Sequence, residues 1–338
     1  MSTRLLSDKD VHALLPMAAC IDVMADALRS VASGDAMLPL RTVLRLGDSA
    51  NAFATMPAVL GRGHAAAIGA KIITVFPGND ATPFDSHIGV VLLFDGVNGA
   101  LLAIADASSI TAIRTSAVSG LSARLLANED ASELAILGAG VLAMPHLDAM
   151  CAVRPIRRLR IWSRSGSAAE SRAQQFAARA RAAHSIEVVV CDSARDAVSD
   201  AHIVCTITSS RTPVLEGAWL SAGAHVCAVG ASLANARELD SAAVQRARLY
   251  VDRRESAFAE AGDFLVPRGE GLITDAHIVG ELGELVAGAV EGRRTPDEIT
   301  LFKSLGLAVE DVAALRYILA RANESGAGFS FDMGGLRH

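Results

Sequence analysis

The sequence predicts an α/β protein that combines a doubly wound parallel sheet with a second α+β domain. At roughly 150 residues per domain, a chain of 338 residues is expected to form about two domains. Hydrophobic residues make up 51% of the chain and aromatic residues only 4%, so the apolar content is mostly aliphatic. After residue 130, short apolar runs alternate with helical segments roughly every 20–30 residues, which is typical of a parallel sheet with helical crossovers.

The first hundred residues predict a different domain, with a mixed or antiparallel sheet under a helical cover. Residues 8–34 carry apolar side chains at helical spacing. A turn signal, Asp95-Gly96-Val97-Asn98-Gly99, lies between two of the β-like stretches that follow. These stretches are 42–46, 53–56, 67–74, 89–94 and 101–106.

The remainder of the chain predicts the parallel sheet and a helical end. Expected strands are 134–137, 159–162, 186–191, 203–206, 224–229 and 249–251, and expected helices are 109–126, 144–150, 167–183 and 194–199. Residues 295–322 are expected to form a helix because apolar residues recur along one face. We therefore expect domains over 1–115, completed by a helix at 307–325, and over 116–306, followed by a loose tail at 326–338.

Composition and charge argue against several functional classes. With 31 Lys and Arg against 37 Asp and Glu, the net charge of −6 disfavours nucleic-acid binding. No apolar run approaches the ~20 residues of a membrane span, and no signal segment is recognised, so a cytoplasmic protein is expected. Five scattered cysteines without a CxxC pair, and no H-x-x-x-H spacing, predict neither a disulfide scaffold nor a metal site.

A glycine-rich turn points to a dinucleotide. Gly138, Gly140 and Ala143 fit the pattern G-x-G-x-x-A directly after the apolar run 134–137. Glycines there permit a tight turn and let backbone N–H groups approach a pyrophosphate at a helix N-terminus. The motif alone is a weak signal, but here it opens the first unit of the alternating region, which predicts a Rossmann-type NAD(P)-binding domain.

The end of the next expected strand indicates which nicotinamide cofactor is used. An acidic residue there would bind the ribose 2′-hydroxyl of NAD, but no Asp or Glu lies between 159 and 169. Instead the chain has Ser163-Arg164-Ser165, in which a guanidinium flanked by hydroxyls suits a 2′-phosphate. We expect NADP(H), with NAD(H) as the alternative; the structural alternative is that Arg164 is an ordinary solvated residue.

Three cationic residues lie in apolar or small-residue surroundings in the first domain. Lys71 interrupts the apolar run 68–75, and Arg41 and Arg114 have similar neighbours. A lysine in a buried strand needs an anionic partner or a function, whereas an edge strand would leave it in water. Together the three predict a site for a small anionic substrate such as a carboxylate. His87 is either a strand cap or a polar group at a pocket rim.

Several stretches together resemble the ornithine cyclodeaminase/μ-crystallin family over nearly the whole chain. They are Leu38-Pro39-Leu40-Arg41, Met56-Pro57, Lys71, 101–106 leading into 110–115, Gly138-Ala139-Gly140, Val229-Gly230, Arg237-Glu238-Leu239, Gly262-Asp263 and 298–306. The resemblance implies a Rossmann domain, and a second domain that binds substrate and builds a homodimer. Members handle imino and amino acids with NAD(P)(H).

The resemblance also implies roles for individual residues. Arg41, Lys71 and Arg114 would hold the substrate carboxylate and carry catalysis, and Ser232 would lie at the substrate. The residues implied at the cofactor are Ser86, His87, Arg114, Thr115, Gly138, Gly140, Val141, Leu142, Ser163, Arg164, Ser165, Thr206, Val229, Gly230 and Ser304.

Two residues depart from the family pattern, one in the glycine turn and one that bears on the reaction. Leu142 stands where the glycine turn usually has Gln, and Ser232 stands where cyclodeaminases carry Asp. A serine hydroxyl is too weak a base to replace a carboxylate in deamination. We therefore expect NADPH-dependent reduction of a small cyclic imino acid, such as Δ1-pyrroline-2-carboxylate to L-proline. The alternatives are an amino-acid dehydrogenase or open-chain imine reductase of the alanine or iminosuccinate type, an ornithine cyclodeaminase, and a μ-crystallin-like NADPH-binding protein with little turnover.

Overall fold

The computed structural model describes residues 2–164 and 166–335, and the chain divides into two compact units. Unit 1 consists of Met1–Thr115 and Gly306–His338, and unit 2 of Ser116–Leu305. The first boundary falls inside helix α3, Ala107–Leu126. The predicted combination of a parallel α/β sheet with a second α+β domain is confirmed.

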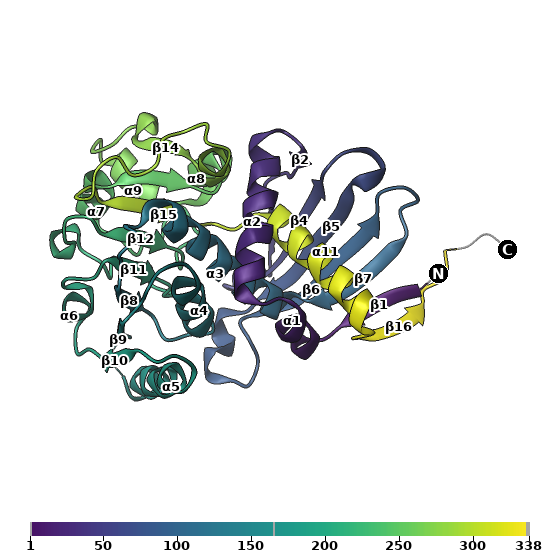
Figure 1. The fold of residues 1–338 in the computed structure, drawn as a ribbon, viewed down its shortest axis with the longest axis horizontal. Coiled ribbons are helices and arrows are strands. Elements are labelled where there is room, and N and C mark those ends of the chain that lie inside the picture. Colours follow the sequence, from purple (N-terminus) through teal and green to yellow (C-terminus); the bar gives the residue numbers. More distant parts are fainter. Residues whose placement is uncertain (1, 165, 336–338) are drawn as a thin grey trace. The chain divides into compact units, whose positions relative to one another are not determined.

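Unit 1 contains an eight-stranded mixed sheet covered on one face by helices (Figure 1). The strand order is β16-β1-β7-β6-β5-β4-β2, with β3 paired to β4. Helix α11 lies across β4, β5 and β6 and also contacts α2. The elements of unit 1 are β1 Ser2–Leu6, α1 Asp8–Leu14, α2 Met17–Ala32, β2 Ala36–Met37, β3 Thr42–Arg45, β4 Ala52–Leu60, β5 Ala67–Val75, β6 His87–Asp95, β7 Leu101–Asp106, α11 Ala308–Ser325 and β16 Phe329–Asp332, with short 3-10 helices at Gly63–Ala65 and Pro77–Ala81.

A glycine lets α11 approach the sheet of unit 1 closely. A Cβ atom at Gly69 of β5 would lie 2.8 Å from a methyl carbon of Val312 and 2.5 Å from the carbonyl oxygen of Leu92. Any side chain at position 69 would therefore push α11 away from β5. The close approach brings the first turn of α11 to Lys71, two residues further along β5.

Unit 2 contains an eight-stranded sheet in which every pair of neighbouring strands is parallel, in the order β10-β9-β8-β11-β12-β15-β13-β14. Its elements are β8 Glu133–Leu137, α4 Ala143–Val153, β9 Arg158–Trp162, α5 Ser167–Ala183, β10 Glu187–Val190, α6 Ala194–Val198, β11 Ile203–Thr206, β12 His225–Ala228, α7 Ser241–Arg246, β13 Arg248–Val251, α8 Arg254–Glu260, α9 Gly262–Gly269, β14 Ile278–Glu281, α10 Leu282–Val286 and β15 Thr300–Lys303, with 3-10 helices at Gly217–Trp219 and Asp275–His277.

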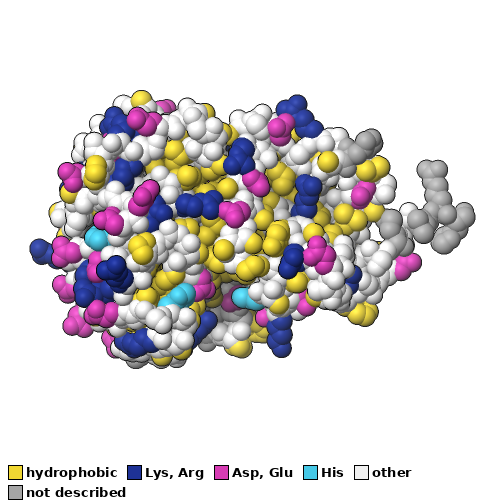
Figure 2. Space-filling view, in the orientation of Figure 1, with side chains coloured by type: hydrophobic (Ala, Val, Ile, Leu, Met, Phe, Trp, Pro, Cys, Tyr) yellow, Lys and Arg dark blue, Asp and Glu magenta, His cyan; other side chains and the backbone are white. Residues whose placement is uncertain are grey.

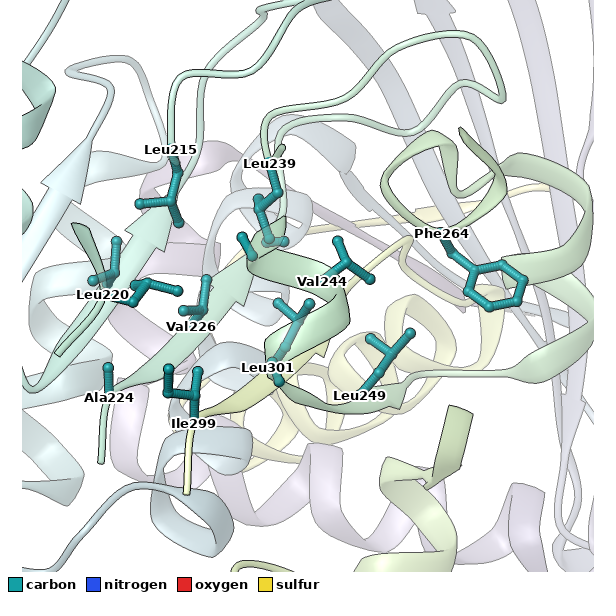
Figure 3. Close-up of a cluster of buried hydrophobic side chains, with 14 of the residues drawn as sticks. Leu215, Leu220, Ala224, Val226, Leu239, Val244, Leu249, Phe264, Ile299 and Leu301 are labelled. Carbon is teal, nitrogen blue, oxygen red and sulfur yellow. The ribbon is translucent and has the colours of Figure 1, made fainter. Parts of the chain in front are cut away.

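Two apolar clusters cover the two faces of the unit 2 sheet. Leu134 and Ile136 of β8 belong to the cluster that includes α4 and α5, whereas Ala135 and Leu137 belong to the cluster that includes α6, α7 and α9. Figure 3 shows part of the second cluster, with Leu301 of β15 beside Val244 of α7. Strands buried on both faces are nearly continuous apolar runs, which is why β11 and β12 contain no exposed residue.

The structure corrects two sequence predictions at the C-terminal end. Residues 295–322 are not one helix, because Thr300–Lys303 forms β15 in the middle of the parallel sheet and α11 begins only at Ala308. A short apolar run buried on both sides cannot be told from a helix by periodicity. The tail is not uniformly loose either, since Phe329–Asp332 forms β16, which pairs antiparallel with β1. The sequence reading also missed β1 itself.

Figure 2 shows Lys and Arg side chains interspersed with Asp and Glu over the face of unit 2 that it draws. In the described chain, no single helix is long and apolar enough to cross a bilayer; only α1 and α2 pass that test as a pair, and they are bent by 86°.

Candidate functional site

The glycine-rich turn of unit 2 connects β8 to α4, as a dinucleotide site requires. Gly138 has a φ of +119°, which L side chains rarely adopt, and a Cβ there would lie 2.9 Å from the carbonyl oxygen of Ile207. A Cβ at Gly140 would meet nothing within 4 Å, so the backbone faces open space there. Ala143 is buried and starts α4. The turn therefore fits a pyrophosphate, with backbone N–H groups and a helix N-terminus available to bind it.

The predicted cofactor residues around this turn and after β9 differ in how far their side chains are exposed. Val141 is 70% exposed, and Leu142, which replaces the usual Gln, is half-buried against the α4–α5 cluster. Leu142 can therefore contribute only its backbone to phosphate binding. At the end of β9, Ser163 is half-buried and Arg164 is exposed, while Ser165 lies outside the described residues.

The last residues of four neighbouring strands form one row at the same edge of the sheet. Leu137 of β8 is in register with Thr206 of β11, which is in register with Ala228 of β12, and Ala228 with Lys303 of β15. Ligands of open α/β sheets bind outside the carboxyl ends of the strands. The predicted cofactor residues Thr206, Val229, Gly230 and Ser304 lie in or directly after this row.

Two of these strand-end residues, Thr206 and Ser304, are buried and hydrogen-bonded to other residues of unit 2. Thr206 is fully buried, and its hydroxyl donates to Oε2 of Glu238 at 2.9 Å. Ser304 is buried, and its N–H donates to the carbonyl of Ala228 at 3.0 Å. Ser232, in contrast, is exposed in the loop that follows Gly230. Glu238 was not predicted as a site residue, although it lies in Arg237-Glu238-Leu239, one of the stretches that resemble the family.

Lys71 of unit 1 is a buried lysine with an anionic partner. Its strand, β5, pairs with β4 on one side and β6 on the other, so the edge-strand alternative is wrong. The side chain is 2% exposed, and its Nζ lies 2.9 Å from Oδ2 of Asp311 on α11. Thr111 of α3 accepts a longer hydrogen bond from the same nitrogen at 3.4 Å.

Arg114 connects both acidic residues of the first turn of α11. Its Nε donates to the other carboxylate oxygen of Asp311 at 2.9 Å, and its Nη1 donates to Glu310 at 2.8 Å. All three side chains are buried, as is Thr115, the next residue on α3. Gly306 allows the guanidinium this position, because a Cβ there would lie 2.5 Å from Nη1 of Arg114.

The cluster lowers the pKa values of both Lys71 and Asp311, for different physical reasons. Burial, and after it the positive charge of Arg114, lowers the pKa of Lys71 to about 8, although Asp311 acts to raise it. Burial acts to raise the pKa of Asp311, but Arg114 and Lys71 outweigh it and hold that pKa below its ordinary value. Lys71 can therefore exchange a proton near neutral pH, while Asp311 stays ionised.

Arg41 and His87 lie near the same cluster. The Nη2 of Arg41 donates to the carbonyl of Gly306 at 3.2 Å, and its side chain is half-buried. His87 is exposed at the start of β6, with Nδ1 2.9 Å from the hydroxyl of Ser86. Partial desolvation, and after it the charge of Lys71, lowers the pKa of His87. The positive charges of Lys71 and Arg41 therefore act on the imidazole of His87.

The acidic partners were not predicted from sequence. We expected the three cations to await an anionic ligand, yet two of them already contact Glu310 and Asp311. The available signal was two adjacent acids among the apolar residues of the first half of α11, which a buried counter-charge would explain. In the part of the chain that the structure describes, no group of His, Cys, Asp or Glu is arranged to hold a metal ion.

A parallel sheet with a glycine turn at its first strand, joined to a unit that buries reactive cations, defines a nicotinamide-dependent oxidoreductase. The chain belongs to the ornithine cyclodeaminase/mu-crystallin family, whose profile matches residues 1–326. It is 38% identical to ketimine reductase mu-crystallin of Mus musculus over 84% of this chain and 85% of that protein. It is 35% identical to a Delta(1)-pyrroline-2-carboxylate reductase of Bacillus cereus over 96% of this chain and 98% of that protein.

Solved structures agree with this family over nearly the whole chain. Delta(1)-pyrroline-2-carboxylate reductase of Thermococcus litoralis, in complex with NADH and L-proline, superposes with a TM-score of 0.91 at 35% identity, covering 97% of this chain and 99% of that one. An archaeal alanine dehydrogenase dimer with bound NAD gives a TM-score of 0.90 at 28% identity, covering 99% and 100%. The expected family and Rossmann-type fold are thus confirmed.

Proposed function

We propose that the protein uses NADPH to reduce a small cyclic imino acid, such as Δ1-pyrroline-2-carboxylate, to the corresponding L-amino acid. The observation that carries the proposal is Lys71, a buried amine with a lowered pKa in a unit that also supplies Arg41 and Arg114. Relatives named as reductases of this imino acid and of ketimines support the substrate class.

The charges of the cluster favour a monocarboxylate. The cluster has a net charge of +1 when every member is ionised, because it contains three cations and two anions: Arg41, Lys71, Arg114, Glu310 and Asp311. Arg41 is the half-buried member, so it is the member that we assign to the substrate carboxylate. A second carboxylate on the substrate would lack a cation among these five, which disfavours dicarboxylates such as iminosuccinate.

NADPH supplies the hydride that adds to the C=N carbon when it is bound. We assign Lys71 the role of orienting the imino acid and giving a proton to its nitrogen, because an amine with a pKa of about 8 is largely protonated at neutral pH. Arg114, held by Glu310 and Asp311, would fix the position of Asp311 and thereby of Lys71. Ser232, which stands where cyclodeaminases carry Asp, favours simple reduction over cyclodeamination.

The preference for NADPH over NADH rests on the residues after β9. Arg164 is exposed there and available to a 2′-phosphate, and no acidic residue lies between 159 and 169 to bind a free 2′-hydroxyl.

We also propose a homodimer that buries the open face of the unit 1 sheet. Along β4 and β5, residues whose side chains face α11 alternate with exposed or half-buried ones. Apolar residues are paired across strands on the open face: Ile68 with Val59 and Phe94, and Ile72 with Val90. A contiguous apolar face of this kind favours a protein partner. The related archaeal alanine dehydrogenase is a dimer, which supports a second copy as that partner.

The test is a spectrophotometric assay of NADPH consumption. We expect consumption with Δ1-pyrroline-2-carboxylate or a related cyclic ketimine, and formation of the L-amino acid. Consumption only with a keto acid and ammonia would favour an amino-acid dehydrogenase, and release of ammonia from ornithine would favour a cyclodeaminase. NADPH binding without turnover of any of these compounds would point to a binding protein.

A further inference from the structure

We infer that Glu238 is a positioning residue for the nicotinamide cofactor, holding the carboxyl ends of β11 and β12 in the geometry that the cofactor requires. The inference rests on the proposed use of a nicotinamide cofactor. Glu238 follows β12 by ten residues along the chain and is completely buried, yet its side chain returns to the strand ends. It is not a group that we expect to touch the reacting atoms.

The carboxylate of Glu238 accepts four hydrogen bonds from the two strand ends. Oε1 accepts from the N–H of Thr208 at 2.6 Å and from its hydroxyl at 2.7 Å. Oε2 accepts from the N–H of Gly230 at 2.6 Å and from the hydroxyl of Thr206 at 2.9 Å. One oxygen therefore binds the segment after β11, and the other binds residues of both segments.

The backbone of Glu238 is itself fixed on both sides. Its N–H donates to Oδ1 of Asp263 at 2.8 Å, and its carbonyl accepts from the N–H groups of Val214 and Leu215. The side chain of the next residue, Leu239, enters the apolar cluster shown in Figure 3. The carboxylate is thus presented from a rigid segment, which is what a positioning group needs.

The segments that follow β11 and β12 approach each other too closely for a side chain at Gly230. A Cβ at Gly230 would lie 2.0 Å from the carbonyl oxygen of Thr208 and 2.7 Å from Oε1 of Glu238. Gly230 thus requires the absence of a side chain, and Glu238 binds the N–H that this close approach buries. Without that acceptor, the N–H of Thr208 would lose its partner, and the N–H of Gly230 would keep only a longer hydrogen bond of 3.2 Å to the carbonyl of Thr206.

A buried lysine extends this network to the third strand of the row. Lys303, the last residue of β15, lies 3.0 Å from Oδ2 of Asp263 and donates to the carbonyls of Ala228 and Ala231. Glu238, Asp263 and Lys303 together connect the ends of β11, β12 and β15, where the predicted cofactor residues lie. This network lies at the edge of the sheet where ligands of open α/β folds bind.

Glutamine at position 238 is a sharp test because neither orientation of its amide satisfies the site. Each carboxylate oxygen accepts one backbone N–H, so the amide NH₂ would face either Thr208 or Gly230. A hydroxyl can rotate to become an acceptor, but a backbone N–H cannot. We expect Glu238→Gln to raise the dissociation constant for NADPH by about tenfold or more, measured by fluorescence titration of the purified full chain.

A matched control separates positioning from general stability. Asp240, two residues further on, uses Oδ1 to accept from the N–H groups of Ala243 and Gly217, away from the strand ends. Asp240→Ala should lower the melting temperature as a lost helix cap does, and leave the NADPH dissociation constant within about twofold of wild type. Folded Glu238→Gln protein that also binds NADPH within about twofold of wild type would overturn the inference.

A milder variant decides the matter if Glu238→Gln fails to fold. Thr208→Val removes one donor to Glu238 and retains the backbone N–H. We expect it to weaken NADPH binding several-fold with a smaller loss of melting temperature, and binding unchanged from wild type would overturn the inference.

Wild-type protein that binds NADPH but reduces no imine would contradict the proposed reaction alone. Wild-type protein that binds neither NADPH nor NADH would contradict both proposals.

Discussion

Asp311 binds Lys71 through one carboxylate oxygen and Arg114 through the other, each at 2.9 Å. The two cations come from β5 and α3, and the carboxylate comes from α11, more than 190 residues later in the chain than Arg114. This shared carboxylate is what permits two buried positive charges to lie side by side. It also acts to raise the pKa of Lys71, against the larger lowering effects of burial and of the charge of Arg114.

Substitution of Lys71 tests its assignment to the substrate site. We expect Lys71→Met to abolish reduction of the imino acid while leaving the NADPH dissociation constant nearly unchanged, because the cofactor motif lies in unit 2. Lys9→Met on the exposed surface of α1 is the matched control and should retain wild-type activity. Loss of NADPH affinity in Lys71→Met would remove Lys71 from the substrate site.

The pH dependence of the reaction follows from the lowered pKa of Lys71. The protonated amine is lost as the pH rises through about 8, so we expect kcat/KM to fall on the alkaline side near that value. The charge of Asp311 raises the pKa of Lys71, and its removal in Asp311→Asn should move this fall to lower pH. An alkaline limb that stays in place in Asp311→Asn would show that Lys71 is not the proton donor.

The buried ion pairs of unit 1 should matter far more for stability than exposed ones. Asp311→Ala leaves Lys71 and Arg114 buried without their shared carboxylate, and we expect the free energy of unfolding to fall by ~3–5 kcal/mol. Asp26 pairs with Arg29 at the surface of α2, so Asp26→Ala should cost about 1 kcal/mol or less. Urea denaturation of both variants measures the difference, and equal losses would contradict the role of burial.

Arg164 should determine the choice between NADPH and NADH. A charge-assisted bond to the 2′-phosphate is worth ~1.5–3 kcal/mol, so Arg164→Ala should raise KM for NADPH by about tenfold or more and leave KM for NADH nearly unchanged. Arg179→Ala, at another exposed position of unit 2 on α5, serves as the control. A wild-type protein that prefers NADH would refute the assignment directly.

The proposed dimer predicts that a charge on the open sheet face produces monomers. Ile72 is paired with Val90 on that face, and Ile72→Asp would place a carboxylate against an apolar surface. We expect wild type to sediment as a dimer and Ile72→Asp as a monomer in analytical ultracentrifugation. Val97→Asp, in the exposed turn between β6 and β7, should remain dimeric. A monomeric wild type would exclude the proposal.

The parts that could be predicted from sequence are those specified by local patterns. The run 134–137 followed by Gly138 and Gly140 identifies strand, turn and ligand class within ten residues, because backbone geometry there depends on glycine itself. Strands β3 to β7 of the first domain could be predicted from apolar runs bounded by turns. The unusual position of Lys71 was visible because a lysine in an apolar run conflicts with burial.

The parts that could not be predicted depend on partners far apart in the chain. Nothing near Lys71 indicates Asp311, and nothing near Thr206 indicates that Glu238 binds its hydroxyl. β15 was mistaken for a helix because its four residues are apolar or buried on both faces, so its alternation carries no signal. β16 has few buried residues, and only its pairing with β1 defines it.

Unit 1 is interrupted in the chain, and this has a consequence for how the protein is made. During synthesis, residues 1–115 leave the exit tunnel of the ribosome long before Gly306–His338. All of unit 2 is synthesised between these two segments. Until α11 emerges, Lys71 of β5 and Arg114 of α3 lack Asp311 as a counter-ion, so neither side chain can be buried away from water as it is in the complete fold. We therefore expect residues 1–115 to remain incompletely folded or chaperone-bound until Gly306–His338 has been synthesised.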